Sequence, residues 1–229
     1  MRREIVNAAL DADASVRAIV IAGEGDKAFI SGADISQFEK LRGTAEAQAE
    51  YNKAVEKAYL APMGCSKPVI ARIRGICIGG GLGFAAACDL RICSEDAVFR
   101  MPAARLGLGY SPAGVRRFMN VLGAANTTDI FMSARKFDAK EALRMGFVSQ
   151  VVPVAALEKT VADYCRMVAE NAPLTVAAAK YAVQQWQKDG KDRDIERAMK
   201  MVEACFASDD HKEGRKAFME KRTPQFKGR

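Results

Sequence analysis

The stretch Lys67–Arg91 constrains the fold more than any other part of the chain. An apolar run at Val69–Ile73 is followed by three consecutive glycines, Gly79–Gly81, and by a short alanine-rich segment, Leu82–Cys88. This order predicts a strand, a tight turn and a short buried helix. Glycines at such a junction let a ligand approach bare backbone, and the first N–H groups of a helix favour an anionic oxygen. Close packing of helix on strand is the alternative explanation for the glycines.

The rest of the chain alternates strand-like and helix-like patterns up to Pro153 and is helical beyond it. Apolar runs predict strands at 16–22, 69–73, 90–93, 97–100 and 147–152, with helices at 45–60, 114–122, 124–133 and 138–144. Such alternation is typical of α/β layers. Helical periodicity then covers 154–170, 174–188, 192–207 and 210–220. The sequence therefore predicts an α/β core over 1–152 and a helical region over 153–229.

The net charge of +7 and the pI near 9.1 indicate an anionic partner without identifying it. The densest basic clusters, at Arg2-Arg3, Arg116-Arg117 and 212–229, have no interleaved aromatic residues of the kind that bind single strands. We therefore do not expect nucleic-acid binding to be the main role. A small anionic ligand remains compatible with the charge.

The sequence shows no apolar run long enough to cross a bilayer, and its first residues lack the central apolar region of a secretory signal. A cytoplasmic protein without a membrane partner is therefore expected. The six cysteines form no C-x-x-C pair and several lie among apolar residues, so we expect buried reduced thiols and neither disulfides nor a metal site.

Two segments, Lys27–Ile35 and Pro68–Asp89 with its glycine triplet, resemble the crotonase superfamily of enoyl-CoA hydratases and isomerases. Further segments resemble that family in the expected order: 102–107, 142–152, 171–174 and 213–222. The resemblance implies a ClpP-like spiral of ββα units with a helical C-terminal trimerisation region. It also implies assembly as a homotrimer or homohexamer. Members usually begin with a further hairpin, which this sequence is expected to lack, because Met1 falls where the first helix would start.

The resemblance assigns an acyl-CoA site to the two glycine-containing segments. The backbone N–H groups of Ala33 and Gly80 would form an oxyanion hole, which stabilises a thioester enolate. Coenzyme A would enter as part of the substrate, and no cofactor is expected to be tightly bound. The residues assigned to coenzyme A binding are Lys27, Gly32, Asp34, Ile35, Phe218 and Lys221. Two of them have plainer explanations, since Lys27 fits a solvated surface residue and Asp34 a helix cap.

The sequence departs from the family at both catalytic carboxylates. Hydratases of the family normally carry two glutamates that hold and deprotonate water, and here Gly83 and Ala103 stand in their places. The chain is thus expected to be an enzyme of the enoyl-CoA hydratase/isomerase family, nominally a lyase of fatty-acid or related metabolism, whose exact reaction stays open. His211, the only histidine, lies in the C-terminal helices and is a poor candidate for the base.

Tyr110 supports one alternative, an acyl-CoA decarboxylase. It lies where methylmalonyl-CoA decarboxylases of this superfamily have a tyrosine, and decarboxylation forms the enolate without a base. Arg105 is a candidate for binding a substrate carboxylate. A non-catalytic acyl-CoA-binding paralogue is the second alternative. A dinucleotide-binding oxidoreductase fits less well, because the helix after Gly81-x-Gly83-x-x-Ala86 ends by Asp89, too early for a βαβ crossover.

Overall fold

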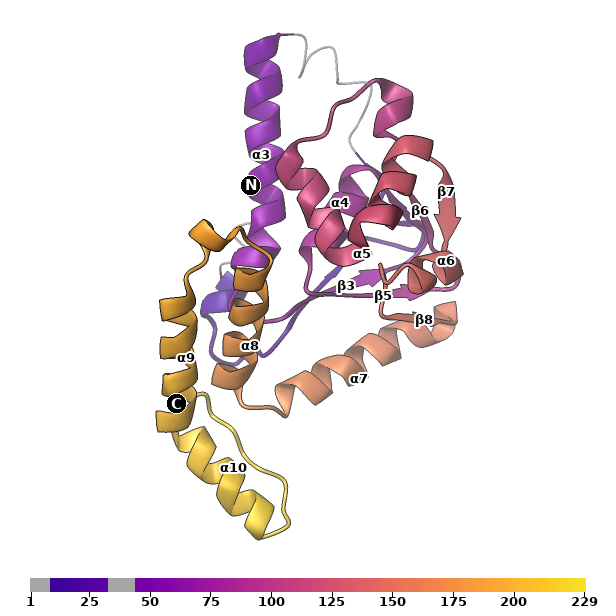
Figure 1. Cartoon of the computed structure of the whole chain (residues 1–229). Helices are drawn as coiled ribbons and strands as arrows, with labels where there is room; N and C mark the ends of the chain where they lie inside the picture. The colour runs from indigo at the N-terminus through magenta and orange to yellow at the C-terminus, as the bar shows by residue number, and fades with distance from the viewer. Residues whose placement is uncertain (1–8, 33–43) are drawn as a thin grey trace.

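Two four-stranded sheets lie at the centre of the computed structural model, which describes residues 9–32 and 44–229 (Figure 1). The first sheet has the order β1-β3-β5-β8 and is entirely parallel. Its strands are β1 (Ile19–Ala22), β3 (Val69–Ile73), β5 (Leu90–Ser94) and β8 (Gln150–Val152). The second sheet has the order β2-β4-β6-β7, and only β7 is antiparallel to its neighbour. Its strands are β2 (Ala28–Ile30), β4 (Ile76–Ile78), β6 (Val98–Arg100) and β7 (Lys136–Asp138).

The first six strands enter the two sheets alternately, and a helix closes each turn. β1 and β2 precede α3 (Ala45–Gly64), and β3 and β4 precede α4 (Gly80–Ala87). β5 and β6 precede a short 3₁₀ helix, η2 (Ala103–Leu106), and α5 (Pro112–Ser133). α6 (Ala139–Arg144) connects β7 to β8. The predicted spiral of ββα units is therefore confirmed.

The first sheet is buried on both faces, as its continuous apolar strands predict. In β3, Val69, Ala71 and Ile73 face the main core, whereas Ile70 packs with Leu157 on the opposite side. Leu157 begins α7 (Leu157–Ala169), which follows the short η3 (Val154–Ala156) and covers that side of the sheet. The alternation follows from the strand period of two residues.

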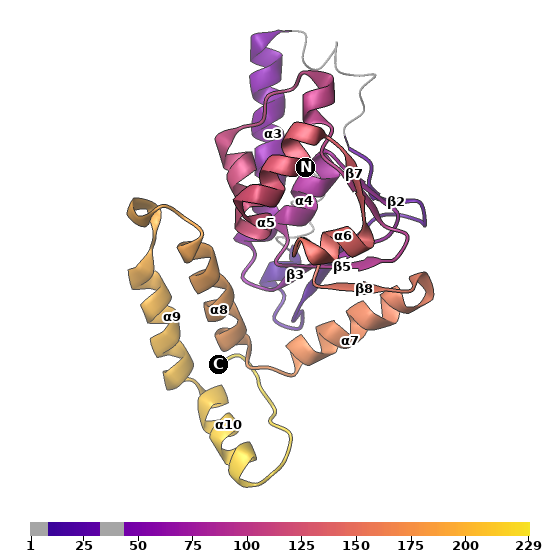
Figure 2. The same cartoon turned by 45° about the vertical axis from the view of Figure 1, so that its right-hand side comes forward.

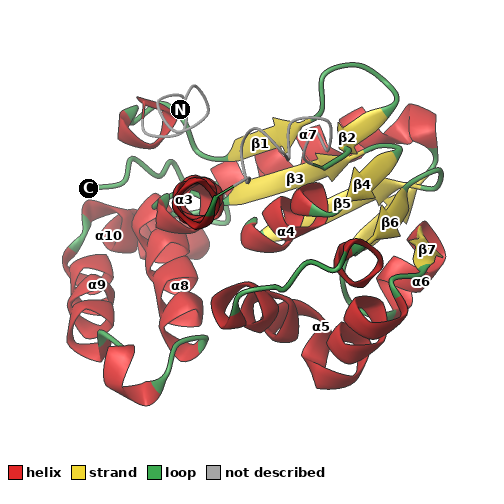
Figure 3. Ribbon diagram, turned by 90° about the horizontal axis from the view of Figure 1, so that it is seen from above, coloured by secondary structure: helices red, strands yellow, loops and turns green. Residues whose placement is uncertain are grey.

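The last three helices form a separate group beside α3. They are α8 (Pro173–Trp186), α9 (Ile195–Ala207) and α10 (Asp209–Met219), with η4 (Gly190–Asp192) between the first two. Figure 2 shows α8 and α9 side by side, with α10 continuing away from the sheets. Seen from above in Figure 3, α3 lies end-on at the junction between this group and the sheets. All four predicted C-terminal helices are present, and α7 alone among them packs on the first sheet.

The structure differs from the sequence prediction mainly in the short strands. β2, β4 and β7, with three residues each, were not predicted, although β6 and β8 are equally short and were. The predicted strand at 147–152 begins only at Gln150, and the helix predicted over 45–60 continues to Gly64. The two helices predicted on either side of Gly123 are confirmed, since its backbone is non-helical at φ 71° and ψ 172°.

All six cysteines lie in the described residues and are free, and four are buried. Burial raises the pKa of Cys88 and of Cys93 to about 12, so both thiols stay protonated at neutral pH. Across residues 9–32 and 44–229, every helix is too short or too polar to span a membrane.

Candidate active site

The site predicted at the glycine triplet lies where α4 begins. Gly79 adopts a positive φ of 56° and its N–H donates to the carbonyl of Arg100 at 2.9 Å. Gly80 opens the helix and is exposed, whereas the residues from Gly81 to Cys88 are buried. The first N–H groups of a helix have no partner within it and carry partial positive charge. An accessible amide of this kind is suited to an anionic oxygen.

The loop after β2 starts beside this helix opening. A Cβ on Gly81 would lie 2.2 Å from the carbonyl oxygen of Ile30, so only glycine lets α4 approach β2 this closely. Gly32, with φ 105°, lies next to the end of β4. The other predicted residues of this loop, Ala33, Asp34 and Ile35, lie outside the described residues.

Two tyrosine hydroxyls occupy the space where a side chain on Gly83 would lie. A Cβ on Gly83 would be 2.9 Å from the Tyr59 hydroxyl oxygen and 3.2 Å from that of Tyr110. The Tyr59 hydroxyl also donates to the Gly80 carbonyl at 3.2 Å. The position of one missing carboxylate is thus bordered by two phenols, which bring proton donors to the first turn of α4.

Packing fixes both rings. Tyr59 lies on α3, is 7% exposed and contacts Phe84 with ring centroids 6.5 Å apart. Tyr110 meets Phe131 edge-on, with centroids 5.1 Å apart. Its ring lies against Gly114, where an added Cβ would come within 2.8 Å of two ring carbons. Tyr110 was predicted from the sequence, whereas nothing in the helical pattern of α3 distinguished Tyr59 from a core residue.

A buried guanidinium lies beside this pair. The Arg117 side chain is 7% exposed, its Cζ lies 4.7 Å from the centre of the Tyr59 ring, and Nη2 donates to Glu56 at 2.9 Å. Its Nε and Nη1 are buried without a hydrogen-bond partner. Burial raises the pKa of Tyr59 and of Tyr110, and the Arg117 charge lowers both more weakly. Both phenols are therefore neutral donors at pH 7.

The second missing carboxylate has no polar replacement in its own position. Ala103 is buried at the start of η2. Arg105, on the same short helix, and Lys27, just before β2, are exposed. The structure therefore leaves Arg105 and Lys27 accessible to a ligand without placing either at Gly80.

Three predicted or considered residues lie in the C-terminal helices, away from α4 in Figures 1 and 2. Phe218 is 83% exposed on α10, and Lys221 follows that helix with a positive φ of 54°. His211 lies in the first turn of α10 and contacts Phe206 edge-on. Within one chain, none of the three reaches the opening of α4. In the described part of the chain, no group of His, Cys, Asp or Glu side chains is arranged to hold a metal.

Comparison with known proteins gives one consistent family. The family model for enoyl-CoA hydratase/isomerase matches residues 1–229. A short-chain-enoyl-CoA hydratase of Clostridium acetobutylicum is 31% identical over 213 residues, which are 93% of this chain and 81% of that protein. A probable enoyl-CoA hydratase of Bacillus subtilis is 36% identical over 223 residues, 95% of this chain and 84% of that protein. The crystal structure of an enoyl-CoA hydratase/carnithine racemase from Magnetospirillum magneticum superimposes with a TM-score of 0.93 at 30% identity, covering 99% of this chain and 84% of that one.

Proposed function

Because the chain belongs to the enoyl-CoA hydratase/isomerase family, we propose that it binds an acyl-CoA thioester and stabilises the enolate formed from it. The observation that carries this proposal is the exposed residue Gly80 at the start of an otherwise buried helix. A thioester oxygen gains negative charge in the transition state, and one preorganised donor contributes about 3 kcal/mol to its stabilisation. The N–H of Ala33 is the second donor of the proposed oxyanion hole.

Coenzyme A is bound as part of the substrate in this proposal. Lys27, Gly32, Asp34 and Ile35 would contact it from the same chain. Phe218 and Lys221 would contribute from a neighbouring copy in a homotrimer or homohexamer, since one chain keeps them away from α4. The exposed apolar side chains of the last helices support such an assembly, Phe206, Phe218 and Met219 being 67%, 83% and 80% exposed. A groove of about 730 Å³ lies between α8, α9 and α10.

Hydration or isomerisation of an enoyl-CoA is the nominal reaction. Its acid and base would have to be groups other than the two glutamates usual in the family. Gly83 and Ala103 offer no carboxylate to activate water. Decarboxylation of an acyl-CoA that carries a free carboxylate besides its thioester is the other candidate reaction. The Tyr59 and Tyr110 hydroxyls at Gly83 favour it, because loss of carbon dioxide forms the enolate without a base. Both reactions require the oxyanion hole and a proton donor for the α-carbon.

Product analysis distinguishes these reactions. The protein is incubated with crotonyl-CoA, a 3-enoyl-CoA and methylmalonyl-CoA in deuterated water, and products are identified by mass spectrometry. A gain of water shows hydration, deuterium incorporation with a shifted double bond shows isomerisation, and loss of carbon dioxide shows decarboxylation. Binding of all three thioesters without turnover would contradict the enzyme proposal and favour a non-catalytic acyl-CoA-binding protein.

A further inference from the structure

Tyr59 is held in a way that a packing residue does not require. Its hydroxyl donates to the carbonyl of Gly80, the residue that carries the proposed oxyanion-hole amide. The Tyr110 hydroxyl lies at the same place, since both phenol oxygens are within 3.2 Å of the Cβ position of Gly83. A phenol has one proton and two acceptor lone pairs. With its proton on Gly80, Tyr59 is able to accept the proton of Tyr110.

We infer that Tyr59 is a positioning residue that holds the Tyr110 hydroxyl across Gly83 as the acid that protonates the enolate at its α-carbon. The inference rests on the proposed function, because it needs an enolate at Gly80. It applies to hydration and to decarboxylation alike, since both end with protonation of that carbon. The absence of a side chain at Gly83 is what admits the two hydroxyls, which lie 2.9 and 3.2 Å from the Cβ position.

The proton step balances within this pair. The Tyr110 O–H bond breaks as the enolate electron pair forms a C–H bond at the α-carbon, and the thioester carbonyl is restored. The Tyr110 oxygen is left as a phenolate. Tyr59 then turns its proton from the Gly80 carbonyl to this oxygen, and water returns a proton to Tyr110 after product leaves.

One charge beside the pair reduces the cost of a transient phenolate in this buried place. The Arg117 guanidinium lies over the Tyr59 ring at 4.7 Å, and Glu56 binds only Nη2. The charge of Arg117 acts to lower the pKa of Tyr110, against the larger effect of burial. Glu56 opposes Arg117 by raising this pKa. Tyr59 is only 7% exposed whereas Tyr110 is half-buried, so Tyr110 is the phenol that a substrate can reach and Tyr59 is its support.

The test compares Tyr59→Phe, Tyr110→Phe and the double variant on whichever thioester the wild-type protein turns over. Each single variant keeps the ring and removes one hydroxyl, and Tyr164→Phe on α7, on the far side of the first sheet, is the matched control. We expect kcat to fall about 100-fold in either single variant with KM within about twofold of wild type. The double variant should be no slower than the slower single variant, because the two hydroxyls act as one unit.

Three results would overturn the inference while leaving the proposed function intact. They are a Tyr59→Phe variant with wild-type kcat, losses that multiply in the double variant, and a loss confined to KM. A loss of kcat that is explained by a lower Tm of the variant would also contradict the inference, because the hydroxyl would then matter only for packing and stability. A wild-type protein inactive on every thioester instead contradicts the proposed function, and the inference fails with it.

Discussion

Gly81 shows how one missing side chain positions the whole site. Its backbone lies against β2, so that an added Cβ would meet the Ile30 carbonyl oxygen at 2.2 Å and the Ile30 Cβ at 2.7 Å. This contact brings the start of α4 next to the loop that carries the second proposed oxyanion-hole donor. A larger residue would have to separate the two, because the obstacle is backbone and not a flexible side chain.

We therefore predict that Gly81→Ala destabilises the protein and abolishes turnover. Overpacking costs typically 1–3 kcal/mol, and about 3 kcal/mol is expected here because backbone atoms must move. Urea unfolding followed by circular dichroism measures the change. Gly109→Ala is the control, because nothing lies within 4 Å of its added Cβ. Equal midpoints for the two variants would show that α4 has room to shift.

Some features of the site were predictable from the local sequence and others were not. The glycine triplet predicted the helix opening at Gly80, whereas the catalytic roles proposed for Gly80 and Tyr110 came from the family resemblance. Tyr59 gave no such signal, because it is 21 positions from Gly80 and reaches it only when α3 packs on α4. Helical spacing tells which residues share a face, and it does not tell which other element that face meets.

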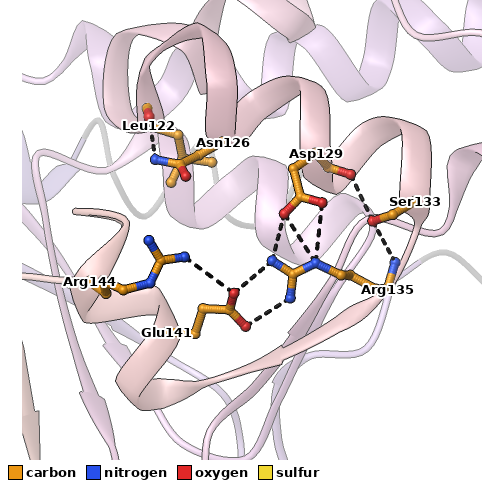
Figure 4. Close-up of polar contacts among 7 residues, drawn as sticks. All are labelled: Leu122, Asn126, Asp129, Ser133, Arg135, Glu141 and Arg144. Atoms are coloured by element: carbon orange, nitrogen blue, oxygen red, sulfur yellow. Dashed lines mark hydrogen bonds and ion pairs between the residues drawn. The ribbon is translucent and has the colours of Figure 1, made fainter.

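At the scale of elements, Arg135 links the end of α5 to α6 through two ion pairs, and it lies just before β7. Figure 4 shows Arg135 between Asp129 of α5 and Glu141 of α6. Its Nη2 lies 2.5 Å from Asp129 Oδ2 and 2.6 Å from Glu141 Oε1. The Arg135 guanidinium lowers the pKa of both carboxyl groups from their ordinary values of 3.8 and 4.5. The network thus stabilises the fold only while these carboxyl groups are ionised.

Arg135→Gln should destabilise the protein by about 1 kcal/mol at pH 7, since the side chains are 28–40% exposed and water screens the pairs. Because the folded pKa values are lowered, the stabilisation is complete above pH 4.5 and disappears as pH falls through those values. Urea unfolding of both proteins between pH 7 and pH 3 measures the difference. Arg144→Gln, with a 67% exposed side chain 3.4 Å from Glu141, should change little. A difference that grows toward low pH would contradict this account.

Long helices were predictable from their own pattern, whereas short strands were predicted unevenly. The helices within 45–64 and 157–219 show several helical periods each and were expected. Of the strands with three residues, β6 and β8 were predicted, and β2, β4 and β7 were not. Their pairing depends on neighbours distant in sequence, such as the turn at Gly75, whose added Cβ would meet the Lys27 carbonyl oxygen at 2.3 Å. That contact exists only after the second sheet has formed.

At the scale of the whole molecule, one buried lysine joins the C-terminal helices to the α/β core. The Lys180 side chain on α8 is 7% exposed, and its Nζ lies 2.7 Å from Asp89 Oδ2. The same Nζ donates to the carbonyls of Pro62 and Lys67 at 3.1 and 2.9 Å. The Asp89 oxygen also accepts from the Val69 N–H at 2.7 Å. One ammonium group thus connects α8 with the end of α3, the start of β3 and the end of α4.

We predict that Lys180→Met separates the unfolding of the C-terminal helices from that of the core. Loss of one partner from a buried pair costs 3–5 kcal/mol, and about 2 kcal/mol is expected here because Asp89 is 28% exposed. Trp186, the only tryptophan, lies at the end of α8 and reports this region by fluorescence, while circular dichroism reports the whole chain. In the variant, the fluorescence transition should occur at a lower urea concentration than the dichroism transition.

Lys200→Met is the control, because Lys200 forms an exposed ion pair with Glu196. Its two transitions should match those of the wild type. Coincident transitions in Lys180→Met would show that apolar packing alone holds α8 on the core.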